Sequence, residues 1–333
     1  MISMAETDNH RFDLRGKRIW VAGHSGMVGA ALTRRLHREG CELLEVSHAE
    51  LDLTRQAETE NWMASARPDA IFIAAAKVGG IVANLTYPAD FLYDNTMIAM
   101  NIMRSAFSLG VQKLLWLGSS CVYPKYAAQP IREDSLLTGA LEPTNEAYAV
   151  AKIAGIKLAE AYARQYGRRF ITAMPTNLYG PNDNFDLETA HVLPALIRKM
   201  HEAKIAGSPS VSVWGTGTPK REFLHVDDLA DACVFVMKRH CGPEIVNIGS
   251  GTEISIQDVA ILIARIVDYR GSIVFDTSKP DGTPRKLVDP IRLQTMGWQP
   301  RIDLEAGLSD LYTRWQQSGH EPNNEAREIL AVG

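Results

Sequence analysis

The chain has 333 residues, of which 46% are hydrophobic and 22% charged, and its net charge is −4. This balance is typical of a globular enzyme with one large core or two unequal domains. No basic tract suggests nucleic-acid binding, and no apolar run reaches the ~20 residues of a membrane-spanning helix. The four cysteines form no C-x-x-C pair, so we expect reduced thiols, no bound metal and a cytoplasmic location.

The first 13 residues are polar and contain no apolar segment of the kind found in a secretory signal. We predict that residues 1–13 are a disordered leader and that ordered structure begins at residue 14.

A glycine-rich turn follows the first predicted strand, Lys17–Ala22, and opens a predicted helix. Gly23 permits a tight turn, Gly26 leaves room for a pyrophosphate at the helix N-terminus, and Gly29 lets helix and strand pack closely. The spacing is G-x-x-G-x-x-G. Its position between a strand and a helix favours a dinucleotide-binding turn over a plain glycine turn.

The end of the second predicted strand, residues 42–46, bears on the choice of cofactor. An acidic residue there would accept a hydrogen bond from the ribose 2′-hydroxyl and select NAD. Glu45 is the only acid near this strand end, and strand alternation does not fix the direction of its side chain. NADP therefore fits better, although Ser25 and His48, rather than an arginine, are available to a 2′-phosphate.

Two further predicted strands, 70–76 and 113–117, end in loops that we expect at the ligand-binding edge of a parallel sheet. The second loop is Gly118-Ser-Ser-Cys-Val-Tyr-Pro124. Its serines could polarise a substrate carbonyl or form an ordinary turn. Between these strands, a predicted helix over 88–109 has apolar residues on more than one face, which indicates burial in its own core or contact with a second subunit.

Tyr148 and Lys152 lie four residues apart on a predicted helix that runs to about residue 167, so their side chains share one face. A phenol titrates near ~10 in water, and a neighbouring cation lowers its pKa. The pair can therefore act as a tuned general acid/base. Because this spacing also arises by chance, its weight comes from the other motifs.

The second half of the chain carries cations and helix caps rather than a clear alternation of strands. Arg221 and the basic residues near 279–286 could bind a diphosphate or could be solvated surface charge. We expect a helix from near Asp227, capped by one of the aspartates. The capping box Ser255-x-x-Asp258 predicts a second helix.

This order of elements predicts an α/β fold with a Rossmann-type doubly wound parallel sheet and a smaller C-terminal α/β lobe. We expect the sheet domain to comprise 14–181 with 226–250, and the lobe to comprise 182–225 with 251–333. A substrate site should lie between them.

Together these residues resemble the extended short-chain dehydrogenase/reductase family, over nearly the whole chain beyond residue 14. The matching motifs are Gly23-x-x-Gly26-x-x-Gly29, Asp52-Leu53, Ser119-Ser120, Tyr148-x-x-x-Lys152 and Pro175–Leu178. Longer runs, such as Leu117–Pro124 and Arg221–Asp228, are similar to members that act on GDP-linked sugars. The resemblance implies a 3,5-epimerase and NADPH-dependent 4-reductase of GDP-4-keto-6-deoxy-D-mannose, and a homodimer formed through helices at 88–109 and 145–166.

The resemblance also implies a role for each candidate residue. Tyr148 would donate the proton to the C4 oxygen, beside Ser119 and tuned by Lys152, while Cys121 and His191 would be the acid/base pair of the epimerisation. The residues implied to bind NADP(H) are Gly23, Ser25, Gly26, Met27, Val28, Gly29, His48, Asp52, Leu53, Leu117, Gly118, Ser120, Lys152, Pro175, Asn177, Leu178 and His191. Those implied to bind the substrate are Lys199, Trp214, Arg221 and Asp281.

The implied chemistry is consistent with these residue types. A ketone at C4 acidifies the protons on C3 and C5, and a thiol and an imidazole can each be tuned to move protons near neutral pH. Without the resemblance, Cys121 could equally be a small buried hydrophobe and His191 a surface residue at a helix start. The alternatives are a GDP-sugar synthase of the GDP-L-colitose type, a nucleotide-sugar 4-epimerase, and a non-enzymatic protein that senses NADP.

Overall fold

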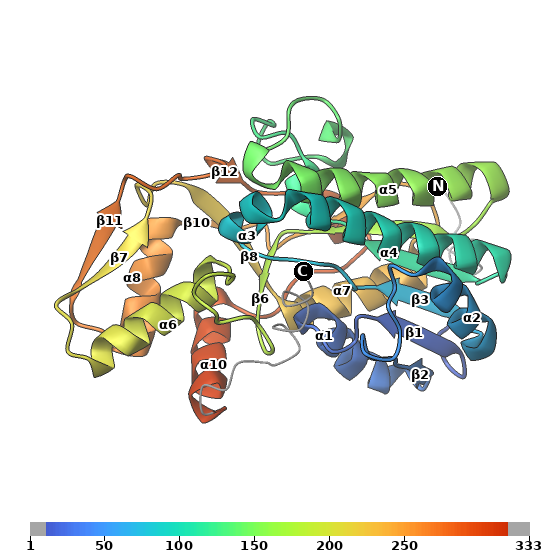
Figure 1. The fold of residues 1–333 in the computed structure, drawn as a ribbon, viewed down its shortest axis with the longest axis horizontal. Coiled ribbons are helices and arrows are strands. Elements are labelled where there is room, and N and C mark those ends of the chain that lie inside the picture. Colours follow the sequence, from blue (N-terminus) through green and yellow to red (C-terminus); the bar gives the residue numbers. More distant parts are fainter. Residues whose placement is uncertain (1–10, 319–333) are drawn as a thin grey trace.

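The computed structural model describes residues 11–318, which form a six-stranded parallel sheet between helices and a smaller lobe beside it (Figure 1). Every neighbouring pair of strands in the large sheet is parallel. The strands, in spatial order, are β2 (Glu42–Leu44), β1 (Arg18–Ala22), β3 (Ala70–Ile73), β4 (Lys113–Leu117), β5 (Phe170–Pro175) and β9 (Val246–Ile248). The predicted doubly wound sheet is confirmed.

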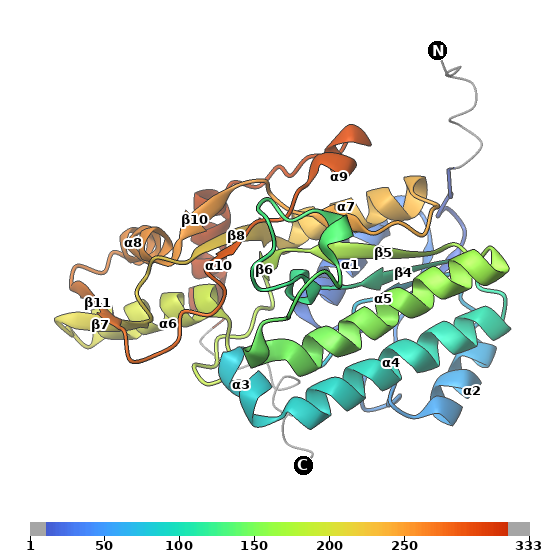
Figure 2. The same cartoon turned by 90° about the horizontal axis from the view of Figure 1, so that it is seen from above.

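Helices cover both faces of this sheet (Figure 2). One face packs on α1 (Met27–Leu36) and α7 (Val226–Arg239), and the other on α2 (Gln56–Ala66), α4 (Pro88–Ser108) and α5 (Glu146–Tyr166). Along β1, Ile19 and Val21 point into the core under α1 and α7, and Trp20 and Ala22 into the core under α2, α4 and α5. Side chains of a strand alternate between the two faces of the sheet in this way. Within residues 11–318, no helix is both long and apolar enough to cross a membrane.

The smaller lobe is built on two short sheets. In one, β8 (Lys220–His225) pairs with β6 (Asn177–Tyr179), β10 (Glu253–Ser255) and β12 (Arg285–Lys286); in the other, β7 (Ser210–Trp214) pairs with β11 (Ser272–Asp276). The core of the lobe is completed by α6 (Val192–Ile205), α8 (Ile256–Val267) and α10 (Leu304–Gln317). Two short helices, α3 (Ile81–Thr86) and α9 (Ile291–Thr295), lie in connections.

Two predicted boundaries are wrong. Phe12, expected in a disordered leader, is buried, and its backbone N–H donates to the carbonyl of Lys238 (2.8 Å). Residues 1–10 lie outside the described residues. Leu293 and Trp298, expected in the lobe, pack in the core between the large sheet and α7. One or two apolar residues in a polar stretch have no periodicity, so the sequence did not reveal which core they join.

The predicted capping box holds, because the backbone N–H of Asp258 donates to the Ser255 hydroxyl (3.0 Å). The predicted aspartate cap of α7 is wrong. His225 occupies the N-cap, and its Nδ1 accepts from the backbone N–H of Asp227 (3.2 Å). An imidazole nitrogen thus replaces the carboxylate oxygen that usually fills this position.

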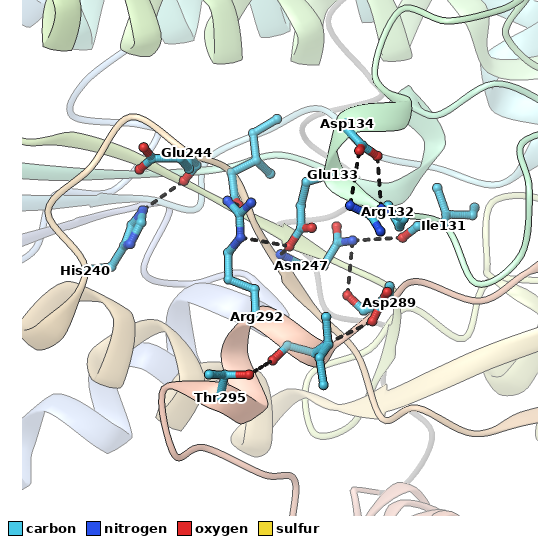
Figure 3. Close-up of polar contacts among 12 residues, drawn as sticks. Ile131, Arg132, Glu133, Asp134, His240, Glu244, Asn247, Asp289, Arg292 and Thr295 are labelled. Carbon is cyan, nitrogen blue, oxygen red and sulfur yellow. Dashed lines mark hydrogen bonds and ion pairs between the residues drawn. The ribbon is translucent and has the colours of Figure 1, made fainter. Parts of the chain in front are cut away.

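A buried polar network centred on Asn247 fixes the loops at the carboxyl end of the sheet (Figure 3). Its side-chain amide donates to the carbonyls of Ile131 (3.0 Å) and Asp289 (3.3 Å). Its side-chain oxygen accepts from the Tyr123 hydroxyl (2.6 Å), and its backbone N–H donates to the Glu133 carboxylate (3.1 Å). The Asn247 side chain therefore joins the connection after β4, at Tyr123 and Ile131, to the segment around Asp289.

These segments also pair with each other. The backbone N–H of Ile131 donates to the carbonyl of Leu287 (2.7 Å), and that of Asp289 donates to the carbonyl of Ile131 (2.8 Å). Arg292 lies 3.7 Å from Glu133 and donates to the Ile245 carbonyl (2.6 Å). The chain that carries β12 is thereby held beside the loop after β4.

We predict that Asn247→Leu removes at least ~2 kcal/mol from the free energy of unfolding, since the Tyr123 hydroxyl and the Asp289 carbonyl each lose their partner at ~1–3 kcal/mol. Urea denaturation measures this loss. Tyr123→Phe, which orphans a single amide oxygen, is the matched variant and should cost only ~1–2 kcal/mol. Equal losses in both variants would contradict the central role of Asn247.

Candidate active site

Two of the three glycines in the turn between β1 and α1 are packed too closely to carry a side chain. A Cβ on Gly29 would lie 1.9 Å from the carbonyl oxygen of Gly23, and a Cβ on Gly23 would lie 2.7 Å from the backbone of Ala75. Gly26 is different, because a Cβ there would meet only the Gly23 oxygen, at 3.7 Å. Gly26 is also the N-cap of α1, and no side chain caps the helix. This open helix N-terminus fits the pyrophosphate of a dinucleotide.

The loop after β2 carries the residues expected near the adenosine ribose. Ser25 and His48 are both exposed. The carboxylate fixed in this loop is Glu50, which accepts from the backbone N–H (3.1 Å) and the hydroxyl (2.7 Å) of Ser47. Asp52 instead bonds the threonine two residues later, through its N–H (2.9 Å) and hydroxyl (2.7 Å). Asp52 therefore organises the loop that leads to α2.

The other residues expected to bind the cofactor follow the carboxyl ends of neighbouring strands. Leu117, Gly118 and Ser120 lie at the end of β4 or just beyond it. Pro175 ends β5, and Asn177 and Leu178 lie on β6. This shared edge is where open α/β sheets bind dinucleotides.

The loop after β4 brings a hydroxyl and a thiol together. The Ser119 Oγ lies 2.8 Å from the Cys121 Sγ, and Ser119 caps the short turn that contains Cys121. From α5, the Tyr148 phenol lies near both, because Ser119 and Cys121 each influence its pKa. The structure therefore brings together the phenol, the hydroxyl and the thiol that were predicted to meet.

Lys152 lies one turn along α5 from Tyr148 and is buried. Its Nζ donates to the Leu117 carbonyl (2.9 Å) and lies 5.7 Å from the centroid of the Tyr148 ring. Burial lowers the pKa of Lys152 to about 7.

Burial also raises the pKa of Tyr148, with a smaller contribution from Cys121 in the same direction and an opposing one from the Ser119 hydrogen bond. This direction is opposite to the one expected from a neighbouring cation, because desolvation of the phenolate dominates. The phenol therefore stays protonated at neutral pH, as a proton donor requires.

Lys286 of the smaller lobe faces the Cys121 thiol, and His191 lies near Lys286. Lys286 on β12 lines a cleft together with Cys121 and Glu142. Burial lowers the pKa of Lys286, while Cys121 opposes that shift. His191, the N-cap of α6, has an exposed surface, yet the protein packed around it and then the Lys286 cation lower its pKa. His191 is therefore neutral at physiological pH.

Sequence reasoning noticed Lys286 only as one of several basic residues. Its place in the site depends on the parallel pairing of β12 with β8, in which Lys286 lies opposite Arg221. A two-residue strand has no sequence signal of its own.

The residues expected to bind the substrate gather in two places on the lobe. Trp214 is 45% exposed and lies between two ammonium groups, with Lys199 5.7 Å and Lys279 5.4 Å from its ring centroid. Arg221 donates to the carbonyl of Asp281 (3.3 Å), and the Asp281 carboxylate accepts from the backbone N–H two residues after Trp214 (2.7 Å). Like Lys286, Lys279 was noticed in the sequence only as one of several basic residues.

Known proteins resemble the chain in both sequence and structure. Residues 19–249 match the model of a family described as the NAD dependent epimerase/dehydratase family. The chain is 60% identical over 299 residues to the GDP-L-fucose synthase of Sinorhizobium fredii, covering 90% of this chain and 95% of that protein. It is 53% identical over 306 residues to that of Escherichia coli, covering 89% and 95%. A crystal structure of a GDP-L-fucose synthetase from Naegleria fowleri bound to NADP matches with a TM-score of 0.86 at 27% identity, covering 95% of this chain and 99% of that one.

We predict that Lys286→Met raises the pKa of His191, because it removes the nearby cation while leaving the imidazole desolvated. The midpoint of the His191 ring titration, followed by NMR, should move to higher pH. Arg285→Met is the matched control, since Arg285 is exposed and paired with Glu253 (2.7 Å). An unchanged midpoint in Lys286→Met would contradict the described contact.

Proposed function

The chain belongs to the NAD dependent epimerase/dehydratase family, and from that premise we propose that it has GDP-L-fucose synthase activity. It is an NADP(H)-dependent enzyme that inverts C3 and C5 of GDP-4-keto-6-deoxy-D-mannose and reduces C4. The observation that carries the proposal is the meeting of Ser119, Cys121 and Tyr148 at the cofactor edge of the sheet. A lysine and a neutral histidine from the lobe complete this constellation.

Epimerisation uses the thiol and the imidazole. The C4 ketone acidifies the neighbouring C–H bonds, and inversion requires one group to remove a proton and another to return one to the opposite face. Cys121 lines the cleft from the sheet domain, and His191 caps α6 of the lobe near Lys286, which lines the same cleft. A neutral imidazole and a thiol can each take either role as the two centres are inverted in turn.

Reduction uses the groups on α5 and the loop after β4. NADPH, when bound, supplies the hydride that adds to C4. Tyr148 is protonated and donates its proton to the developing C4 alkoxide, while the Ser119 hydroxyl hydrogen-bonds to the same oxygen. Lys152 supplies a positive charge next to the phenol and stabilises the phenolate that forms as the proton leaves.

The smaller lobe binds the nucleotide part of the substrate. The exposed face of Trp214 can stack on a guanine base, and Lys199 and Lys279 lie beside it. Arg221 and Lys286, on paired strands, provide the positive charge that a diphosphate needs. Asp281 fixes the loop after Trp214 to the loop next to Arg221.

Sequence identity favours the GDP-L-fucose precursor over the GDP-L-colitose precursor as the substrate. A GDP-L-colitose synthase from Yersinia pseudotuberculosis is 39% identical over 294 residues, against 60% for the Sinorhizobium protein. A nucleotide-sugar 4-epimerase would have no use for the paired thiol and imidazole. A protein that only senses NADP would need none of the three groups around Ser119.

The active form is a homodimer joined through the region of 88–109 and 145–166. Helices α4 and α5 lie side by side along their lengths (Figure 2), and Leu92, Tyr93 and Val150 on them are 40%, 59% and 42% exposed. Sedimentation should give twice the mass of one chain, and Tyr93→Glu should shift the protein towards the monomer. A wild-type mass of one chain would contradict the dimer.

We predict that the two reactions separate by mutation. Tyr148→Phe removes the proton donor, so NADPH oxidation with GDP-4-keto-6-deoxy-D-mannose should fall by about 10²–10⁴-fold. Exchange of solvent deuterium into C3 and C5, followed by NMR, should survive. Cys121→Ser should lose the exchange.

Tyr126→Phe is the matched control, because Tyr126 is 80% exposed and should retain both activities. Wild-type enzyme that oxidises NADPH without exchange at C3 and C5 would disprove the epimerase assignment.

A further inference from the structure

Trp116 lies directly beneath the reactive end of α5. It is on β4, is fully buried, and its ring centroid is 4.2 Å from the Nζ of Lys152. Its indole N–H donates to the backbone carbonyl of the same lysine (3.4 Å). One side chain therefore contacts Lys152 at both its ammonium and its backbone.

A glycine makes this contact possible. Gly155 lies one turn along α5 from Lys152, and a Cβ there would lie 2.7–2.8 Å from three atoms of the indole ring. Glycine is unfavourable in the interior of a helix, so its presence calls for a local reason. Here the reason is the close approach of the indole to the helix backbone.

The buried ammonium has few other partners. Its Nζ donates to the Leu117 carbonyl (2.9 Å), and among the described residues no carboxylate forms an ion pair with it. Burial lowers the pKa of Lys152 to about 7, and the Cys121 thiol on the loop after β4 opposes that shift. An aromatic face attracts a cation, and does so more strongly where both are desolvated.

We propose that Trp116 is a positioning residue of the reaction, whose ring face stabilises the ammonium form of Lys152 and holds it one helical turn from Tyr148. Its part in reduction rests on the proposed function. Its effect on the charge of Lys152 is a property of the folded chain alone.

The expected change in pH dependence follows from the charge of the lysine. Reduction needs the ammonium form, which is lost as pH rises through the pKa of Lys152. Removing the aromatic face destabilises that form and lowers this pKa further. The alkaline limb of the pH profile of kcat should therefore move to lower pH, by about one pH unit for a desolvated cation–π contact.

The first experiment compares pH profiles of NADPH oxidation with GDP-4-keto-6-deoxy-D-mannose. Trp116→Leu and Gly155→Ala, which respectively remove and displace the indole, should both shift the alkaline limb down. Trp116→Phe keeps an aromatic face and should restore most of the wild-type profile. Trp20→Leu is the control, because Trp20 is equally buried in the same core but contacts the Trp62 ring instead (centroids 4.5 Å apart). A uniform loss of rate with an unmoved limb would overturn the proposal.

The second experiment does not depend on turnover. The Nζ resonance of Lys152 in ¹⁵N-lysine-labelled protein, assigned by its loss in Lys152→Met, reports the charge state directly. Its titration midpoint should fall in Trp116→Leu and stay near the wild-type value in Trp116→Phe. Identical midpoints in wild type and Trp116→Leu would overturn the proposal. Absence of turnover in the wild type, with the midpoints shifted as expected, would instead refute the proposed function.

Discussion

The site depends on the contact between the end of β4 and the first half of α5. That contact buries Lys152 against the Leu117 carbonyl and brings the Tyr148 phenol close to Ser119. Cys121 follows on the same loop and shares the serine. Because strand, loop and helix are packed in one core, the distances between hydroxyl, thiol and phenol are set by the fold.

A second constraint joins the two lobes. The network around Asn247 holds the chain just after β12 against the loop that follows β4 (Figure 3). Lys286 thereby reaches the cleft beside Cys121, although the two lie far apart in the chain. Lys286 and the loop that carries Cys121 are thus held beside each other by these hydrogen bonds.

Much of this arrangement could be predicted from local patterns. The glycine turn, the parallel strands and the Tyr148–Lys152 pair have periodicities or spacings that do not depend on distant residues. Short strands such as β12, and single apolar residues such as Phe12, have no such signal, so their positions followed only from the structure. The raised pKa of Tyr148 could not be predicted from the sequence either, because desolvation depends on the whole surrounding core.

The central claim is that epimerisation and reduction occur in one pocket above one cofactor. The most direct test is NMR of the product formed in D₂O from GDP-4-keto-6-deoxy-D-mannose and unlabelled NADPH. The expected product is GDP-L-fucose with deuterium at C3 and C5 and protium at C4. A reduced product with protium retained at C3 and C5 would contradict it.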